Sequence, residues 1–269
     1  MSDLYIPSIS IGFMFVSLAF SLILPIVLYI VFRKKYNGDF VPFLIGMAVM
    51  VVFAFVLEAL LHRIVLYSPI GETVRNNVLL YGLYGGVAAA LFEECGRYFA
   101  FSRLMKKYMA NDGNALIYGV GHGGIECFVV LGMTMISNIV MAMMINNGNG
   151  EAMLQGLEGE NLASAQGLIM TLVNTAPFQF LAGTFERAAA MILQLSMSVL
   201  VFFAVKKHKD SYLLYSLLIH FLADFLTVLL ADRSLILAEA AVFTIAILAA
   251  LFAKKVWDEE HTPFISEEE

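Results

Sequence analysis

The sequence predicts an all-α protein, a polytopic bundle of about seven transmembrane helices. Hydrophobic residues make up 60% of the 269 residues and charged residues only 14%, against about 45–50% and about 25% in soluble domains. The mean hydropathy is +0.82. Apolar runs of about 20 residues, the length that crosses a bilayer, recur along the chain. We expect the spans at residues 10–32, 41–61, 78–101, 115–145, 188–205, 211–230 and 234–253.

The chain is expected to form one transmembrane helical domain over residues 1–256, followed by an acidic cytoplasmic tail over residues 257–269. The segment 167–185 is moderately apolar, but Asn174 and Pro177 interrupt it. A proline inside a helix removes a backbone hydrogen bond and kinks or ends the helix. We therefore expect a re-entrant or lip helix there, leading into the fifth span.

Basic residues between the spans indicate an orientation. They are concentrated on one side of the predicted membrane, after the first, third, fifth and seventh spans, whereas the other side carries few. The clustered residues are Arg33, Lys34, Lys35, Arg103, Lys106, Lys107, Lys206, Lys207, Lys209, Lys254 and Lys255. Because cytoplasmic loops carry the excess of Lys and Arg, the pattern predicts a multi-pass protein of the cell membrane with its N-terminus outside and its C-terminus in the cytoplasm.

Composition also excludes some classes of protein. The net charge is −6, and the sequence has no basic face of the kind that nucleic acid requires. Cys95 and Cys127 both lie in predicted spans, so the two cysteines do not suggest a disulfide framework. The lipid bilayer is the partner that the sequence establishes, and the oligomeric state stays open.

Three ionisable residues interrupt the apolar run 78–101: Glu93, Glu94 and Arg97. A charge at mid-depth in a bilayer costs several kcal/mol unless it is paired or hydrated. On a helix, Glu93 and Arg97 are four residues apart and Glu94 and Arg97 three apart, so an internal ion pair is available. One carboxylate is then left over, and we place the chemistry there.

Two further spans carry polar pairs at helical spacing. His122 and Glu126 are four residues apart, and so are His220 and Asp224, which puts each pair on one helix face. At about 1.5 Å per residue, these groups and Glu93 lie about 10–20 Å from the basic ends of their helices. We therefore expect one shared polar layer within the membrane.

Other groups have more ordinary interpretations. Gln194 could line the polar layer, whereas Glu186 and Arg187 are expected to form a local anchor near the outer surface. Glu58 is interpreted as a carboxylate that pairs with a neighbour or reaches toward the interface. The glycines of the run 119–124 either allow close helix packing or expose backbone beside His122.

Such a layer could hydrolyse an amide in two ways. Imidazoles and carboxylates can hold Zn²⁺ with one position open for water. The candidate ligands are Glu93, His122, Glu126 and His220. Alternatively, a buried glutamate activates water directly, and His220 or Asp224 stabilises the oxyanion. Neither pair has the His-Glu-x-x-His spacing of a zinc helix, so both routes stay open.

The set of motifs resembles the YhfC family of intramembrane metalloproteases, a branch of the larger group that contains the CAAX prenyl endopeptidases and bacteriocin-processing enzymes. The resemblance runs over roughly half of the chain, and each motif is short. The matching motifs, in order, are Glu93-Glu94-x-x-Arg97, Gly121-His122-Gly123-Gly124-x-Glu126, Glu186-Arg187 and His220-x-x-x-Asp224. Two residues separate Glu94 from Arg97, as in the YhfC branch, whereas the CAAX branch has three.

The resemblance implies a role for each matched residue. Glu93 resembles the water-activating glutamate, with Glu94 and Arg97 as its support. His122 resembles its partner in activating water or holding a metal. His220 and Asp224 resemble the pair that stabilises the oxyanion. The sequence departs from the family at Gln194, where a His is frequent, and this departure removes a possible metal ligand.

We therefore expect a membrane-embedded peptidase that cleaves a peptide or membrane-protein substrate in or near the bilayer, reached from the cytoplasmic side. Two alternatives stay open. A proton- or cation-coupled transporter would use the same groups to relay charge, but it would need polar residues across the whole membrane instead of one layer. A non-catalytic scaffold on a protease-like fold would keep these groups for helix association.

Overall fold

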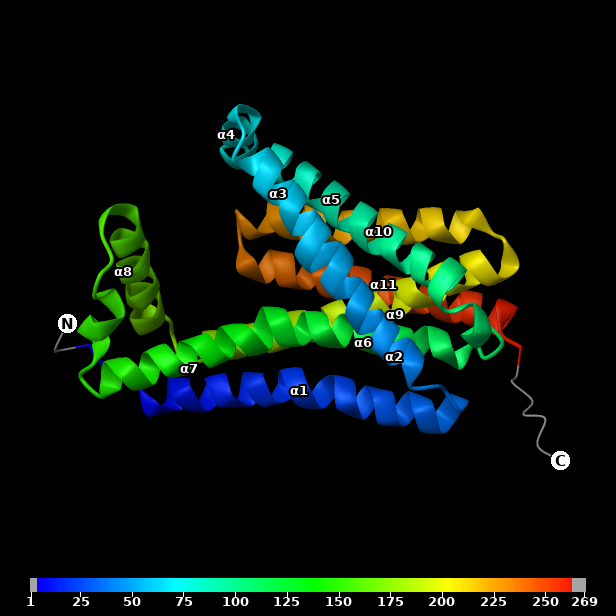
Figure 1. Ribbon diagram of the computed structural model, residues 1–269, viewed down its shortest axis with the longest axis horizontal. Coiled ribbons are helices and arrows are strands. Elements are labelled where there is room, and N and C mark those ends of the chain that lie inside the picture. Colours follow the sequence, from blue (N-terminus) through cyan, green and yellow to red (C-terminus); the bar gives the residue numbers. More distant parts are fainter. Residues whose placement is uncertain (1–3, 263–269) are drawn as a thin grey trace. The chain divides into compact units, whose positions relative to one another are not determined.

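The computed structural model describes residues 4–262, and within this range all regular structure is helical. The helices of this range that are long and apolar enough to cross a membrane number 7. They are Ser8–Tyr36, Val41–Leu66, Val78–Leu104, Gly113–Asn146, Gln179–Lys207, Asp210–Ala231 and Leu235–Glu260. The prediction of an all-α bundle with about seven spans is confirmed, and the chain is a multi-pass membrane protein (Figure 1). The direction in which it crosses the membrane stays a prediction.

The chain divides into two compact units. The first unit holds Met1–Leu24 and Cys127–Arg187, and the second holds Pro25–Glu126 and Ala188–Glu269. Several long helices contribute to both units. The helices and turns of the described chain, in order, are α1 (Ser8–Tyr36), α2 (Val41–Met50), η1 (Val51–Glu58), α3 (Ala59–Leu66), α4 (Pro69–Arg75), α5 (Val78–Phe99), η2 (Ala100–Leu104), η3 (Lys106–Tyr108), α6 (Gly113–Cys127), η4 (Phe128–Gly132), α7 (Met133–Asn146), η5 (Gly150–Leu154), α8 (Gly159–Asn174), α9 (Gln179–Lys207), α10 (Asp210–Ala231) and α11 (Leu235–Glu260).

The segment 167–185 is divided between two helices. Its first part belongs to α8, which ends at Asn174, and its last part begins α9 at Gln179. With 16 residues, α8 is shorter than the about 20 residues of a span. The fifth span was predicted to begin at residue 188, and this boundary is wrong because α9 starts at Gln179. Glu186 and Arg187 form an ion pair with each other, so their charges do not end the helix.

The first unit has its own apolar core. Its buried side chains come from the segment before α1 and from α1, η4, α7, α8 and the start of α9: Ile6, Met14, Leu131, Met135, Ile139, Ala142, Ile145, Ile169, Leu172 and Phe180. Asn146 binds both backbone groups of Ile6, at 2.8 Å to its nitrogen and 2.9 Å to its oxygen. Ser17 donates to the backbone oxygen of Phe180 at 2.7 Å. These bonds satisfy polar groups that lipid could not.

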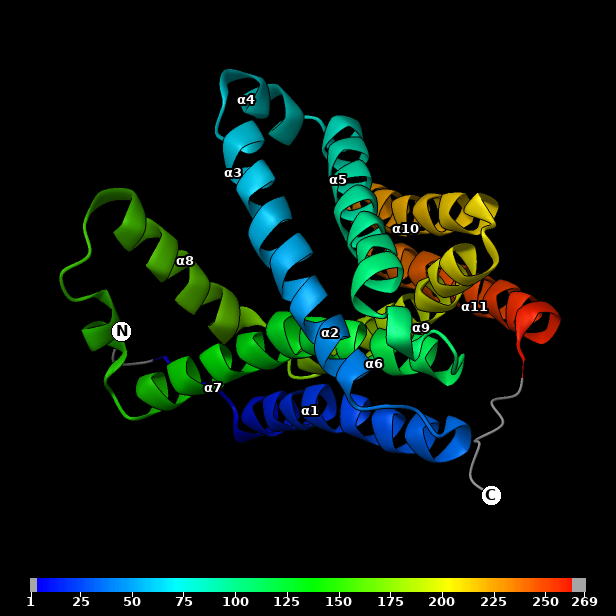
Figure 2. The same cartoon turned by 45° about the vertical axis from the view of Figure 1, so that its right-hand side comes forward.

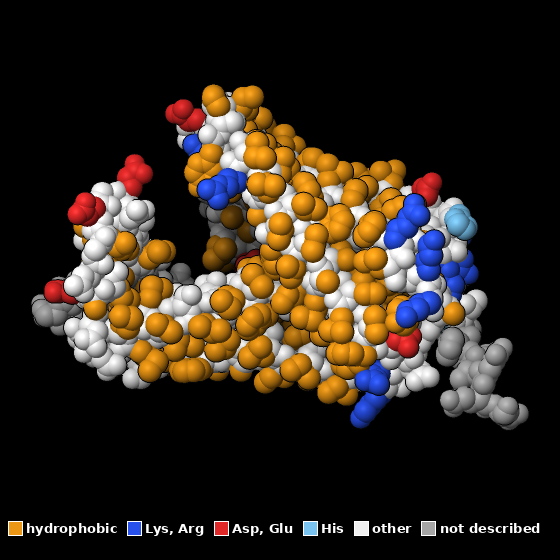
Figure 3. Space-filling model, in the orientation of Figure 1, with side chains coloured by type: hydrophobic (Ala, Val, Ile, Leu, Met, Phe, Trp, Pro, Cys, Tyr) orange, Lys and Arg blue, Asp and Glu red, His pale blue; other side chains and the backbone are white. Residues whose placement is uncertain are grey.

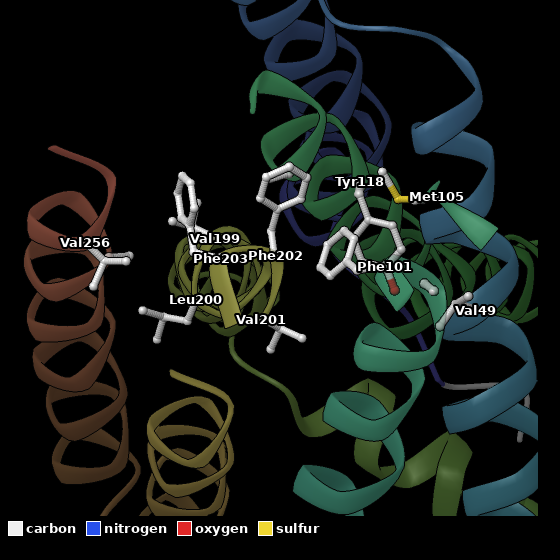
Figure 4. Packing of buried hydrophobic residues seen from close by; sticks show 13 residues of the cluster. Val49, Phe101, Met105, Tyr118, Val199, Leu200, Val201, Phe202, Phe203 and Val256 are labelled. Carbon is white, nitrogen blue, oxygen red and sulfur yellow. The ribbon is translucent and has the colours of Figure 1, made fainter. Parts of the chain in front are cut away.

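In the second unit, apolar side chains of α9 form a buried core with side chains of η2, α6 and α11. Phe202 and Phe203 of α9 lie in this core with Phe101 and Tyr118, all fully buried (Figure 4). Within this unit α10 runs beside α5 and beside α11, and α4 joins α3 to α5 at one end (Figure 2). Lys and Arg side chains gather mainly at the opposite end, and hydrophobic side chains cover the flank (Figure 3).

Buried polar side chains fix the connections at this lysine-rich end. Asn114 at the start of α6 accepts from the Asp39 backbone nitrogen and donates to the Asp39 carboxylate, both at 2.8 Å. Asp112, which is fully buried, accepts from Lys206 at 2.5 Å and from the Thr262 backbone nitrogen at 2.9 Å. Helix α11 ends at Glu260, so the first residues of the predicted tail 257–269 belong to this helix. Residues 263–269 of the tail lie outside the described residues.

Glycines allow α2 and α6 to pack backbone against backbone. A Cβ atom on Gly121 of α6 would overlap the carbonyl oxygen of Phe43, and one on Gly46 of α2 would overlap the carbonyl oxygen of Tyr118. A Cβ atom on Gly46 would also come within 2.8 Å of the backbone nitrogen of His122. The packing interpretation of these glycines is therefore correct, and the contact fixes the height and rotation of the helix that carries His122.

Replacing Gly121 with alanine should destabilise the protein by at least about 2 kcal/mol, because a rigid carbonyl cannot yield to the new methyl group. Gly85→Ala is the matched control, since a Cβ at Gly85 meets nothing within 4 Å and alanine is the better helix former by about 1 kcal/mol. Thermal unfolding of both variants in detergent measures the difference. Equal unfolding temperatures for the two variants would contradict the close packing of α2 on α6.

Candidate functional site

Four helices of the second unit bring polar side chains to one place. Helix α5 supplies the two adjacent glutamates and the arginine, α6 a histidine and a glutamate, α9 a glutamine, and α10 a serine, a histidine and an aspartate. The side chains concerned are Glu93, Glu94, Arg97, His122, Glu126, Gln194, Ser216, His220 and Asp224. Most of them are almost completely buried; Glu94, Arg97 and His122 have no exposed surface. An apolar surrounding makes every unpaired charge here costly.

Arg97 joins three of these side chains. Its guanidinium forms an ion pair with Glu94 and donates to the Gln194 side-chain oxygen. It also lies 3.5 Å from Glu93 Oε2. A guanidinium has a planar fork of donors, so one residue can hold both carboxylates of its own helix and reach α9. The ion pair that the sequence predicted within α5 is present.

Glu93 is held on one of its two oxygens. Oε2 accepts from Gln194 Nε2 at 3.0 Å and lies 3.0 Å from His122 Nε2. Oε1 faces His220 Nε2 at 3.7 Å, which is longer than a hydrogen bond. The carboxylate is therefore oriented through Oε2, and Oε1 points toward α10.

Glu94 sets the orientation of His220. Its Oε1 lies 2.7 Å from His220 Nδ1, and its Oε2 accepts from the Ser216 hydroxyl at 2.5 Å. A carboxylate that is ionised only accepts, so Nδ1 carries the proton. The other ring nitrogen, Nε2, then faces Glu93 and also Asp224, whose Oδ2 is 3.4 Å away. The Asp224 side chain is 41% exposed, so this edge of the cluster is its open edge.

His122 is enclosed on its second nitrogen by Tyr118, one helical turn away. The Tyr118 hydroxyl lies 3.4 Å from His122 Nδ1, and the two rings are 5.7 Å apart. Glu126, one turn further along α6, reaches the cluster through Gln194, whose Nε2 donates to Glu126 Oε2 at 2.6 Å. Both polar groups of α6 thus face the same layer as Glu93.

The predicted site residues therefore meet, some directly and some through Gln194. Sequence reasoning missed Ser216 and Tyr118, although each lies four residues before a site histidine and so on the same helix face. Gln194 was expected only to line the layer, yet it contacts three site residues. Glu186 and Arg187 belong to the first unit.

The arrangement of donors does not suit a metal ion. Within the described part of the chain, no three His, Cys, Asp or Glu side chains are grouped so that they could hold one. Glu93 Oε2 already faces donors from His122, Gln194 and Arg97. Arg97 Nε is buried and has no hydrogen-bond partner among the described residues, so it requires an acceptor such as water instead of a cation. The predicted set Glu93, His122, Glu126 and His220 does not form a zinc site in this arrangement.

Fold and site define a multi-pass helical membrane protein with a buried cluster of glutamate, histidine and arginine. The family described as "YhfC intramembrane metalloprotease" matches residues 20–247. A protein of Bacillus subtilis (strain 168), described as "Uncharacterized membrane protein YhfC", is 36% identical over 242 residues, which cover 89% of this chain and 92% of that protein. The chain belongs to the YhfC family. No solved structure matches it.

Arg97→Met should destabilise the protein by roughly 3–5 kcal/mol, because it removes the buried guanidinium that the carboxylates of Glu93 and Glu94 share as a partner. Lys254→Met removes an exposed ion pair with Asp258 and should cause no measurable loss, since such pairs contribute little. Reversible unfolding in mixed micelles compares the two variants. A stable Arg97→Met protein would mean that the buried charges are compensated by other groups.

Proposed function

We propose that this protein is a membrane-embedded peptidase in which Glu93 activates water for attack on a peptide bond. The observation that carries the proposal is that the two carboxylate oxygens of Glu93 have different surroundings. Three groups face Oε2, whereas Oε1 faces the open edge of the cluster beside His220 and Asp224. A carboxylate positioned in this way can take a proton without losing the bonds that orient it.

In the proposed reaction, a water molecule beside Glu93 Oε1 gives its proton to that oxygen as its own oxygen attacks the peptide carbonyl carbon. A tetrahedral intermediate forms. Glu93 then passes the proton to the amide nitrogen, the C–N bond breaks, and a carboxylic acid and an amine leave. The same carboxyl group serves as base and then as acid, so the proton balance closes.

His220 is assigned to the oxyanion. The role requires a proton on both ring nitrogens, so that Nδ1–H donates to Glu94 while Nε2–H remains for the negative oxygen of the intermediate. Asp224 is 3.4 Å from Nε2 and can orient this donor. Preorganised donors in a water-poor site typically contribute a factor of about 10²–10³ to the rate. His122, Glu94, Arg97 and Gln194 act as positioning residues.

Glu93→Gln should reduce cleavage by at least about a hundredfold, because an amide cannot take the proton. Glu72→Gln, in α4 outside the cluster, is the control and should cleave normally. Purified protein in liposomes is mixed with a panel of single-span test peptides, and cut sites are read by mass spectrometry. Undiminished turnover by a correctly folded Glu93→Gln protein would rule out Glu93 as the base.

The family name implies a metal, whereas the arrangement of donors at Glu93 supports direct activation of water. We therefore expect that prolonged treatment with a chelator leaves cleavage within about twofold of the untreated rate, since no step depends on a metal ion. Elemental analysis of the same samples should find only substoichiometric zinc. Stoichiometric zinc that is lost together with activity, and restored together with it, would assign Glu93, His122, Glu126 and His220 as ligands instead.

A further inference from the structure

A cavity of about 270 Å³ lies in the second unit at the open edge of the catalytic cluster. Residues of η1, α3, α5 and α10 line it, among them Glu58, His62, Leu66, Tyr84, Asp224 and Val228. The volume is just below the about 300–1,000 Å³ of sites for small molecules. It suits one long side chain better than a whole ligand.

The lining combines an apolar wall with negative charge. Leu66, Val228 and the glycine edge of α5 form the wall, and a Cβ on Gly85 would meet nothing within 4 Å. Glu58 and Asp224 supply two carboxylates, and the described lining residues include no Lys or Arg. A Lys or Arg side chain has the matching form, an apolar stem with a cationic end.

A short hydrogen-bonded chain holds Glu58 in place. His62 Nε2 lies 3.1 Å from Glu58 Oε1, and His62 Nδ1 lies 2.9 Å from the Tyr84 hydroxyl. One assignment satisfies all three groups: the phenol donates to Nδ1, and Nε2–H donates to the carboxylate. In this assignment the Glu58 carboxylate accepts from His62 and lies at the cavity although the residue is only 9% exposed, so it can also accept from a cationic side chain. Glu58 is also the last residue of the π-helix η1, a type of turn that often occurs at functional sites.

Asp224 connects the cavity to the reaction. It lines the cavity, and its Oδ2 is 3.4 Å from His220 Nε2, which is 3.7 Å from Glu93 Oε1. A side chain in the cavity would therefore belong to a residue next to the bond that Glu93 attacks. The cavity extends from Asp224 to Leu66, the last residue of α3, and to Tyr81 in the first turn of α5, which are the helix ends that α4 joins.

We propose that this cavity is a specificity subsite that binds a basic side chain, Lys or Arg, of the peptide substrate beside the scissile bond. The proposal rests on the proposed peptidase function. Glu58 receives the cationic end, His62 and Tyr84 position Glu58, and the apolar wall covers the stem. The substrate class is thus a membrane-associated peptide with a basic residue at the cleavage site.

Binding tests the subsite without requiring turnover. The probes are two labelled leucine–alanine peptides that differ at one central position, lysine in one and norleucine in the other. Equilibrium dialysis is carried out with the Glu93→Gln protein in uncharged maltoside detergent. The lysine peptide should bind about tenfold more tightly, as expected for a charge-assisted hydrogen bond. Equal affinities for the two peptides would overturn the proposal.

Variants locate the preference. Adding Glu58→Gln should abolish the preference for lysine, whereas Glu58→Asp, which keeps the charge, should retain part of it, and Glu72→Gln should leave it unchanged. Retention of the full preference by a folded Glu58→Gln protein, or its loss in Glu72→Gln, would overturn the assignment. Phosphatidylethanolamine, which carries the same ammonium group, is added as a competitor; it should not displace the peptide, and full displacement would assign the cavity to a lipid headgroup instead.

The two proposals can fail separately. If Glu93→Gln still cleaves test peptides but the lysine preference depends on Glu58, the cavity binds cations and the assigned base is wrong. If Glu93 is required for cleavage and the two probes bind equally, the peptidase stands and the subsite is wrong.

Discussion

The arrangement of the second unit depends on the burial of Arg97. A guanidinium without exposed surface must find counter-charges and acceptors inside the protein, since neither lipid nor apolar side chains can supply them. Its partners Glu93 and Glu94 in turn need donors, which come from α6, α9 and α10. Four helices are thereby fixed in register by one network. Buried ion pairs of this kind are weak evidence for net stability, and the proposed reaction would require the fixed positions that this network gives.

The glycine contact between α2 and α6 serves the same end by different means. Gly46 and Gly121 let two backbones approach so closely that any side chain would separate them. In lipid, such close packing is a main source of helix association. It brings the middle of α6 against α2, and the side chain of His122, whose backbone nitrogen lies at the contact, reaches Glu93. The packing of α2 on α6 sets the position of the His122 ring, and the hydrogen bond with Glu93 sets its orientation.

Local patterns were sufficient for the spans and for the pairing within each helix. A run of about 20 apolar residues crosses a bilayer wherever it occurs, and residues four apart share a helix face, so the layer of Glu93, His122 and His220 could be anticipated. Contacts between helices could not. Ser216 becomes a site residue only when α10 is placed beside Glu94. Glu58 and His62 lie four residues apart, so their contact followed from the same rule and was overlooked, whereas the contact of His62 with Tyr84 of α5 could not be anticipated. The start of α9 was placed too late because the interruption at Asn174 and Pro177 was extended to residue 185, whereas α8 ends at Asn174 and α9 begins at Gln179.

Gln194 illustrates the limit of reasoning from a family pattern. The family frequently has a histidine at this position, and the glutamine was interpreted as the loss of a metal ligand. In the structure, the amide group of Gln194 instead forms three hydrogen bonds within the site. The carbonyl oxygen accepts from Arg97, and the amide nitrogen donates both to Glu93 and to Glu126. A neutral imidazole has one donor and one acceptor, so it could not make all three bonds. With glutamine at this position, the carboxylates of Glu93 and Glu126 share one amide donor. Gln194 cannot replace a histidine ligand, and its amide group instead orients the Glu93 carboxylate. The same substitution that argues against a metal site therefore supports a mechanism in which Glu93 acts on water directly.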